Sequence, residues 1–374
     1  MACLAASLMD VHGHICRQEG AQQARCATGR DDSKERADLT TQPNAKVRKR
    51  IIVLHAQSSP EWRWITQHMP DVDWTLVRAP VPRGKIRDRL GTFMAALRAV
   101  RMGRQADLVV SLGPGVAAAM EIGRRILRVK TPHIAYFLNF TTLPRGLARL
   151  RQAQSYRTID RLVVSSVVEE AIYADHFGID PARFETVLWG VNRPHFSDQP
   201  VAGAPYICAI GGNARDYGLL MAVAAARPHM RFIVVVRPHN LVGLTVPSNV
   251  ETKTNIPYGD AMAVVKGARI MALPLQSADT PCGHVTIVGA QYLDVPIIAT
   301  ASTGVEDYIR DGETGLLVDV GSAQAMGEAI DRLWAEPATG QRLADAARAF
   351  VEAECNELNY VNHLRRQLAL APQI

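Results

Sequence analysis

Cysteine is scarce in this chain of 374 residues, and its spacing does not suggest a metal site. The six cysteines form neither a Cys-x-x-Cys pair nor a Cys/His cluster; they are Cys3, Cys16, Cys26, Cys208, Cys282 and Cys355. Scattered thiols of this kind are typical of a protein from a reducing compartment. We therefore expect free cysteines and a cytoplasmic location, and a disulfide-stapled fold is excluded.

Long apolar runs and aromatic residues are also scarce. No apolar run reaches the ~18 residues that a membrane-spanning helix needs, so we expect no transmembrane segment. The first nine residues are apolar but lack a basic region before them and meet Asp10, so we expect no cleaved signal peptide. Aromatic residues make up 6% of the chain and form no stacking array. Without a recognised module we do not expect nucleic-acid binding, the alternative that a net charge of +6 suggests.

Acidic residues are few between residues 46 and 150, a stretch that holds 19 Lys and Arg but only 6 Asp and Glu. The rest of the chain is mildly acidic, because the total is only +6. A basic region of this kind suits an anionic lipid surface, a phosphorylated ligand or nucleic acid, or it forms an ordinary solvated face.

Residues 84–104 within the basic region predict an amphipathic helix. Apolar residues recur at helical spacing and arginines fill the other sides. The apolar set is Ile86, Leu90, Phe93, Met94 and Leu97. Such a helix can lie on an anionic membrane as a peripheral contact. Alternatively, its apolar stripe packs on a sheet and its arginines face water.

The order of patterns along the chain predicts two α/β domains behind a disordered extension. Residues 1–45 are polar, mixed in charge and without a hydrophobic period. From residue 46 onward, short apolar runs alternate with helical patterns, which indicates parallel β-α-β units. The alternation restarts after a Pro- and Gly-rich linker. We therefore expect an N-terminal domain over 46–198, a C-terminal domain over 199–345 and C-terminal helices over 346–374.

The loops at the carboxyl ends of the strands are the candidate ligand sites in folds of this kind. The first is Gly211-Gly212-Asn213, which follows an apolar run and leads to Arg215. Glycines permit close backbone approach, and an arginine at a helix start can bind phosphate together with free backbone N–H groups. An ordinary turn with a surface arginine is the alternative.

Two further loops lie nearer the C-terminus. Gly283 precedes a helical pattern whose first N–H groups could hold a diphosphate, and His284 or Thr286 could add a contact or simply cap the helix. In the third loop, Glu306 could contact a ligand hydroxyl or remain solvated. Tight turns at Asp311-Gly312 and Thr314-Gly315 then lead into an apolar strand.

Together these segments resemble the nucleotide-sugar glycosyltransferases of the large retaining family 4 type. The most similar stretch is 269–330, with Gly-Val-Glu-Asp-Tyr-Ile-x-Asp-Gly-x-Thr-Gly-Leu-Leu-Val at 304–318. The similarity is strong from residue 160 onward and weaker across 49–150. The resemblance implies two doubly wound Rossmann-like domains facing across a cleft, the GT-B fold, with C-terminal helices crossing back onto the N-terminal domain.

The resemblance also implies roles for individual residues. The C-terminal domain would bind the nucleotide-sugar donor, and Arg215 and His284 would act in the reaction. The basic position that holds the donor phosphates matches Arg215, and the diphosphate loop matches 283–286. Arg237 and His239 follow the strand where the base-binding edge begins. The implied donor set is Gly211, Gly212, Asn213, Arg215, Arg237, His239, Gly283, His284, Val285, Thr286 and Glu306.

The chain departs from the family pattern at three places. Two glutamates eight positions apart are common in the family, and here Pro281 and Gly289 occupy those positions. The second glutamate normally binds the ribose, which a glycine cannot do. Residues 55–62 replace the glycine-rich acceptor loop, and Asn139 lies near where the acceptor-domain histidine would fall.

The expected function is transfer of a sugar from a nucleotide-diphosphate sugar to an acceptor hydroxyl. We expect a saccharide or lipid-linked acceptor, a polysaccharide precursor for example, at a membrane surface. The resemblance also implies retention of anomeric configuration. No metal-binding pattern is visible, so we expect transfer without a metal or other cofactor. The alternatives are an epimerase on the same scaffold and a non-catalytic nucleotide-sugar-binding partner of a polysaccharide assembly complex.

Overall fold

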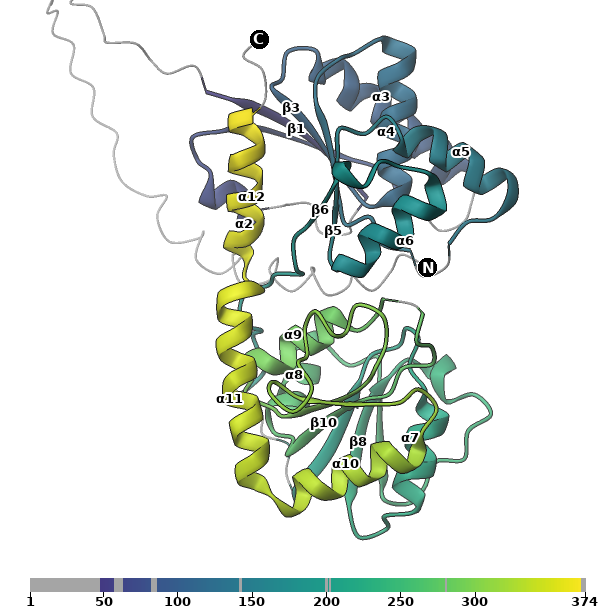
Figure 1. The fold of residues 1–374 in the computed structure, drawn as a ribbon, viewed down its shortest axis with the longest axis vertical. Coiled ribbons are helices and arrows are strands. Elements are labelled where there is room, and N and C mark those ends of the chain that lie inside the picture. The colour runs from purple at the N-terminus through teal and green to yellow at the C-terminus, as the bar shows by residue number, and fades with distance from the viewer. Residues whose placement is uncertain are drawn as a thin grey trace, which may run out of the picture.

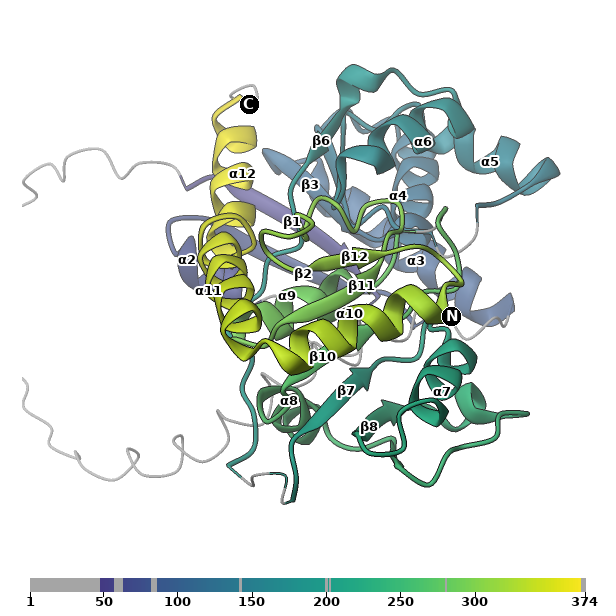
Figure 2. The ribbon, with the colours of Figure 1, turned by 60° about the horizontal axis from the view of Figure 1, so that its bottom comes forward.

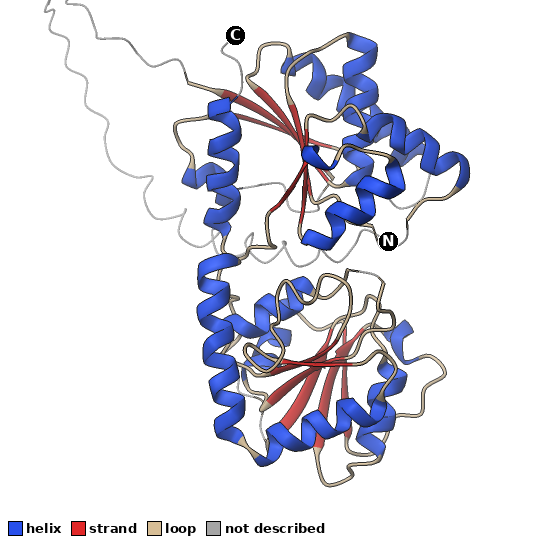
Figure 3. Ribbon diagram, viewed as in Figure 1, coloured by secondary structure: helices blue, strands red, loops and turns tan. Residues whose placement is uncertain are grey.

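The computed structural model describes residues 48–56, 63–81, 86–140, 143–198, 201, 203–279 and 281–370. The expected extension over 1–45 lies outside the described residues, as does most of the segment that replaces the acceptor loop. The described residues form two α/β domains, one above the other in Figure 1. Each is built on a six-stranded sheet flanked by helices (Figure 3). This confirms the expected fold class.

The N-terminal sheet has the strand order β2-β1-β3-β4-β5-β6, and every pairing is parallel. Its strands are β1 (Arg50–His55), β2 (Asp73–Arg78), β3 (Leu108–Leu112), β4 (His133–Tyr136), β5 (Arg161–Val164) and β6 (Phe184–Thr186). Its helices are α2 (Arg63–His68), α3 (Ile86–Gly103), α4 (Pro114–Leu127), α5 (Gly146–Tyr156) and α6 (Val167–Phe177), with a 3-10 turn η3 (Pro181–Arg183). The central strands are continuous apolar runs because helices cover both faces of the sheet.

The C-terminal sheet has the order β12-β11-β10-β7-β8-β9, again with parallel pairing throughout. Its strands are β7 (Tyr206–Ile210), β8 (Arg231–Val236), β9 (Val250–Thr254), β10 (Ile270–Leu273), β11 (Ile297–Thr300) and β12 (Leu316–Val318). Its helices are α7 (Tyr217–Ala225), α8 (Tyr258–Lys266), α9 (His284–Tyr292) and α10 (Ala323–Ala335), with a 3-10 turn η4 (Pro238–Leu241). The strand order reverses between β7 and β10, and such a switch point is where ligands bind in doubly wound folds.

Two helices end the described chain, α11 (Pro337–Glu354) and α12 (Glu357–Leu370). They stand end to end on one side of the molecule, with α11 beside the lower domain and α12 beside the upper one (Figures 1 and 2). Leu343, Ala347 and Val351 of α11 are buried against the C-terminal domain, whereas Tyr360 and Leu364 of α12 join the N-terminal core. The expected crossing segment 346–374 therefore starts inside α11, and α12 alone packs on the N-terminal domain.

The expected helix over 84–104 is α3, but three of the five residues of its apolar stripe are exposed and Phe93 and Leu97 are half-buried. The side chains that α3 buries are Ala96, Ala99 and Val100, which lie on the sheet with Gly103. Ile86, Leu90 and Met94 are 85%, 62% and 58% exposed. The small residues, rather than the large apolar ones, therefore form the core side of α3.

Candidate functional site

The reversal point of the C-terminal sheet brings together two of the loops that the sequence singles out. Gly211 follows β7 directly, and the segment leading to Gly283 follows β10. An antiparallel bridge between Arg215 and Leu275 ties the two segments to each other. Residues about 70 positions apart in the chain thus form one surface at the carboxyl edge of the sheet.

Arg215 is the centre of this surface and is buried, with 5% of its area exposed. Its guanidinium donates to the carbonyls of Ile210 (3.3 Å) and Asn213 (2.9 Å), which shapes its own loop. It also reaches the second loop, donating to the Thr286 hydroxyl at 3.2 Å and contacting the Cys282 sulfur at 3.7 Å. Arg215 therefore holds both loops together and places a buried positive charge beneath them.

Two glycines make room for this guanidinium. Gly211 has φ +114°, and a Cβ there would lie 2.9 Å from Nη2 of Arg215. Gly283 has φ +98°, and a Cβ there would lie 3.0 Å from Leu273 and 3.8 Å from the guanidinium. Both positive φ values favour glycine as well. Any side chain at either position would displace Arg215 or strain the loop.

Helix α9 begins at this surface, with Gly283 as its N-cap residue. No side chain caps the helix, so His284 and Thr286 do not fill the capping role that the sequence left open. An α-helix leaves the N–H groups of its first turn without helical partners, and its dipole favours an anion there. The start of α9 beside the charge of Arg215 can therefore bind a diphosphate.

His284 lies in a different place from the one its expected role suggests. Its ring is 6% exposed and stacks on Tyr308 at 4.5 Å with an interplanar angle of 18°. Its Nε2 has no hydrogen-bond partner among the described residues. Burial lowers the pKa of His284 to about 4, so the ring is neutral at pH 7. It packs behind the loop, and a catalytic role for it stays a prediction.

The other expected donor residues lie at or beside the same edge. Gly212 is close to Arg237, whose Cγ would be 3.1 Å from a Cβ at position 212. Asn240, which sequence reasoning missed, donates to the Gly212 carbonyl at 2.9 Å and so joins η4 to the first loop. Val285 is half-buried on α9, whereas His239 and Glu306 are exposed. No contact in the described chain ties His239 or Glu306 to the Arg215 surface.

The positions of the missing glutamates are both buried. A Cβ at Gly289 would contact Met262 on α8 and Pro194 of the linker, each at 3.7 Å. The linker thus packs against the side of α9 that carries Gly289. Any contact with a ribose must therefore come from a residue other than Gly289, which has no side chain.

The N-terminal sheet has its own reversal point, between β1 and β3, at the edge that faces the C-terminal domain. His55 ends β1 there, is 2% exposed and has no partner for Nδ1 among the described residues. Burial and the nearby Arg78 charge lower the pKa of His55, so it is neutral at pH 7. Gly113 and Gly115 open α4 beside it, with open space where a Cβ would be. Sequence reasoning missed His55; its signal was a lone histidine at the end of the first strand.

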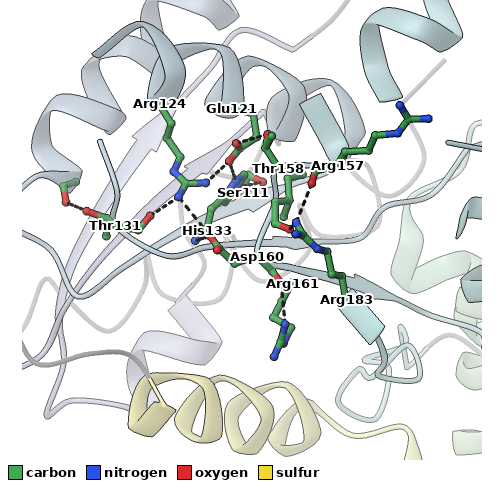
Figure 4. Close-up of polar contacts among 12 residues, drawn as sticks. Ser111, Glu121, Arg124, Thr131, His133, Arg157, Thr158, Asp160, Arg161 and Arg183 are labelled. Carbon is green, nitrogen blue, oxygen red and sulfur yellow. Dashed lines mark hydrogen bonds and ion pairs between the residues drawn. The ribbon is translucent and has the colours of Figure 1, made fainter. Parts of the chain in front are cut away.

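A buried polar network in the N-terminal domain joins α4 to strands β3 and β4 (Figure 4). His133 Nδ1 bonds Glu121 at 2.6 Å and Nε2 bonds Ser111 at 2.8 Å, while Arg124 pairs with Glu121. The order Ser-His-Glu is that of a hydrolase triad, but all three side chains are buried. The network is a structural element that satisfies its own charges.

None of the described helices combines the length and the apolar character that crossing a bilayer demands. Among the same residues, no three His, Cys, Asp or Glu side chains gather as a metal site would require.

Comparison with solved structures identifies the class of fold. The chain resembles Anabaena HepE, solved with UDP, with a TM-score of 0.64 and 11% identity over 86% of this chain and 99% of that one. It also resembles sucrose-phosphate synthase from Thermosynechococcus elongatus, with a TM-score of 0.68 and 18% identity over 87% of this chain and all of that one. The protein therefore has the GT-B fold.

A family model matches part of the C-terminal half of the chain. The family model for "Glycosyl transferases group 1" matches residues 243–350. A D-inositol 3-phosphate glycosyltransferase of Mycobacterium sp. (strain JLS) is 29% identical over 210 residues, which are 50% of this chain and 47% of that protein. The lipopolysaccharide core biosynthesis glycosyltransferase LpsE of Rhizobium meliloti is 33% identical over 78 residues, 21% of this chain and 23% of that one. The chain spans at most about half the length of these relatives. The chain thus has the GT-B fold, and residues 243–350 resemble the group 1 glycosyl transferases.

Proposed function

We propose that the protein transfers a sugar from a nucleotide-diphosphate sugar to an acceptor hydroxyl. The observation that carries the proposal is the joining of two glycine loops around buried Arg215 at the start of α9. This arrangement suits a diphosphate, since it combines free backbone N–H groups, a helix dipole and a fixed positive charge. UDP is the first nucleotide to test, because structural relatives were solved with UDP and with UDP-glucose.

In the proposed reaction the site stabilises the leaving group. Negative charge builds on the nucleoside diphosphate as the bond to the sugar breaks, and the charge of Arg215 and the N–H groups of α9 oppose it. These groups are already in place, because Arg215 is held by backbone carbonyls and by Thr286. We propose that no metal takes part and that anomeric configuration is retained. The product anomer, measured by NMR coupling constants, tests retention.

We propose that the acceptor binds at the N-terminal switch point, where His55 and the start of α4 face the C-terminal domain. Nδ1 of His55 is buried without a partner among the described residues, so an acceptor hydroxyl would bond it only after this edge opens. The acceptor class that the outer surface favours is a saccharide on a lipid or polysaccharide precursor, held at an anionic membrane.

The surface that supports this acceptor class consists of α3, α4 and α5, neighbouring helices on one face of the sheet. Residues 86–157 hold 13 Lys and Arg but only Asp88, Asp107 and Glu121 as acids. Each of these acids is paired with a basic side chain. Ile86, Leu90 and Met94 on α3, with Leu147 and Leu150 on α5, are exposed among the arginines. Exposed apolar residues beside arginines suit the headgroup region of an anionic bilayer.

The experiment that tests the proposal is incorporation of radiolabelled sugar from UDP-glucose, UDP-galactose and GDP-mannose. Membranes supply the acceptor, and label is counted in the solvent-extracted lipid and in the polysaccharide. We expect one donor to label one of these fractions in a protein-dependent way. Binding of UDP without any labelled product would contradict the transfer step.

A non-catalytic partner that binds a nucleotide sugar is the second candidate. It is favoured by Gly289, which lacks the ribose-binding carboxylate, and by the linker packed beside it. The same assay separates the two functions, since this partner would bind the nucleotide and transfer nothing.

A further inference from the structure

A separate set of contacts joins the two domains at the cleft, and the proposed chemistry does not use it. The C-terminal domain contributes Asp307 and Tyr308, which lie between β11 and β12. The N-terminal domain contributes Ser165, Ser166 and Val167, where β5 passes into α6.

Asp307 caps a helix of the opposite domain. Ser166 is the N-cap residue of α6, but its hydroxyl makes no bond to the helix. It donates instead to Oδ2 of Asp307 at 2.6 Å, and the Val167 N–H donates to the same oxygen at 2.9 Å. A carboxylate at a helix N-terminus is also favoured by the helix dipole. The capping group that α6 needs is thus supplied by a residue 140 positions away, in the other domain.

Tyr308 makes the second contact. It is 1% exposed, and its hydroxyl donates to the Ser165 carbonyl at 2.6 Å and accepts from the Trp189 N–H at 2.7 Å. One buried hydroxyl therefore satisfies two backbone groups of the N-terminal half of the chain. Removing it would leave both groups buried without this partner, which is costly.

The same segment touches the candidate donor loop. The ring of Tyr308 stacks on His284, the first residue of α9, and Gln291 of α9 donates to the Tyr308 carbonyl at 2.8 Å. Gly304 lies between the two sides: a Cβ there would be 2.8 Å from Ser166 Oγ and 3.4 Å from His284 Nε2. A continuous packed path thus runs from the start of α9 through 304–308 to the start of α6.

We propose that Asp307 and Tyr308 are positioning residues that dock α6 of the acceptor domain onto the donor loop. They fix the distance between a nucleotide at the start of α9 and an acceptor held by the N-terminal domain. The catalytic consequence of this docking rests on the proposed function. The docking itself does not depend on it. Reaction geometry of this kind affects turnover more than binding of either substrate alone.

The docking is tested first without any ligand, by hydrogen exchange of the peptide covering 165–170. We expect exchange of the Val167 amide to rise at least tenfold in Asp307→Ala and much less in Asp307→Asn, whose amide oxygen can still accept. Asp319→Ala, an exposed aspartate of the same domain, is the matched control and should match wild type. Unchanged exchange in Asp307→Ala would overturn the docking. If Asp307→Ala does not fold, Tyr308→Phe replaces it, and exchange is then measured at the Trp189 amide, which donates to the hydroxyl that this variant removes. Unchanged exchange at Trp189 would overturn the docking.

The catalytic consequence is tested with UDP binding and turnover. In Asp307→Ala and Tyr308→Phe we expect kcat to fall about tenfold, with the Kd of UDP and the donor KM within twofold of wild type. Asp307→Asn should recover most of the rate. Equal changes in KM and kcat, or no change beyond Asp319→Ala, would overturn the positioning role. Failure of the wild type to bind UDP would count against the proposed function and leave the exchange result standing.

Discussion

The two domains share one scaffold, a six-stranded parallel sheet covered by helices, but they use charge in opposite ways. Among its described residues, the C-terminal domain buries one arginine, Arg215, between glycine loops at the carboxyl edge of its sheet. The N-terminal domain carries an excess of arginines on its outer helices and closes its buried charges into the Glu121–Arg124–His133 network. Nearly the same backbone therefore presents the proposed site for a small anion in one domain and a broad basic surface in the other.

This contrast explains why function attaches to loops and outer surfaces rather than to the fold itself. At the C-terminal edge, the proposed ligand binding depends on backbone N–H groups that a ligand can approach closely. Glycine is therefore the residue that marks this site in the sequence. On the N-terminal domain it depends on which side chains face water. The largest effects of substitution on stability and activity should therefore stay within one domain. Four variants and one chelation experiment test this expectation.

The largest effect on stability is expected in the N-terminal domain from Glu121→Ala. It leaves Arg124 and His133 buried without their carboxylate, which should cost about 3–5 kcal/mol. Urea unfolding followed by Trp74 and Trp334, one in each domain, measures it. Only the N-terminal transition should shift. The control is Glu328→Ala, whose side chain is exposed on α10. Equal shifts in both transitions would mean that the domains unfold as one unit.

The largest effect on activity is expected in the C-terminal domain from Arg215→Ala. Losing one preorganised group that stabilises developing charge typically lowers the rate about 100-fold. The transfer rate is compared with that of Arg332→Ala, an exposed arginine on α10. Arg215→Lys separates charge from shape, since lysine keeps the charge but cannot span both loops. A rate within threefold of wild type in Arg215→Ala would remove the arginine from the mechanism.

On the outer surface of the N-terminal domain, Leu147→Glu with Leu150→Glu should weaken binding to anionic vesicles about tenfold. That factor corresponds to roughly 1.4 kcal/mol, about the burial of one leucine side chain. Co-sedimentation with phosphatidylglycerol vesicles measures it, and Val242→Glu on the other domain is the control. Binding that is insensitive to the pair, or equal on neutral vesicles, would show that the surface is only solvated.

A smaller effect is expected at the junction between the domains, where burial raises the pKa of Glu357 to about 7. Its carboxyl accepts from Asn192 at 2.6 Å. The native state then holds a proton that the unfolded chain releases near pH 4.5, so this contribution is present below pH 4.5 and is lost as pH rises through 7. Glu357→Gln should therefore gain stability relative to wild type between pH 5 and pH 8. A difference that does not change with pH would contradict the raised pKa.

The smallest effect is expected from chelation. If Arg215 and the start of α9 neutralise the diphosphate without help, EDTA should change the transfer rate by less than twofold. Restoration of a lost rate by Mg²⁺ or Mn²⁺ would show that a metal shares the charge.

Most of the sheet and the donor loops could be predicted from the sequence, because both depend on local patterns. An apolar run followed by Gly211, or Gly283 before a helix, is visible within ten residues. The Gly304–Val318 motif also carried the family resemblance. The contacts of Asp307 with Ser166 could not be found in this way, since 140 positions separate them. Helix α5 was missed as well: its first turn is exposed, and only Ala153, Ser155 and Tyr156 are buried, so its apolar residues do not mark a core face.

The packing of α3 shows a second limit of sequence patterns. Its large apolar residues have the spacing of a core face, yet Ala96, Ala99 and Gly103 are the ones that pack on the sheet. A helical period fixes which residues share a side. It does not fix which side meets the core when small residues allow closer packing.

Direct binding of nucleoside diphosphates tests the central claim most directly. Calorimetric titration of the full chain with UDP, GDP and ADP is compared with the same titrations of Arg215→Ala and Arg332→Ala. We predict saturable one-to-one binding of one nucleotide to wild type and to Arg332→Ala, and at least tenfold weaker binding to Arg215→Ala. Absence of binding by all three nucleotides at millimolar concentration, in wild type that is folded, would contradict the assignment of the Arg215 surface as a donor site.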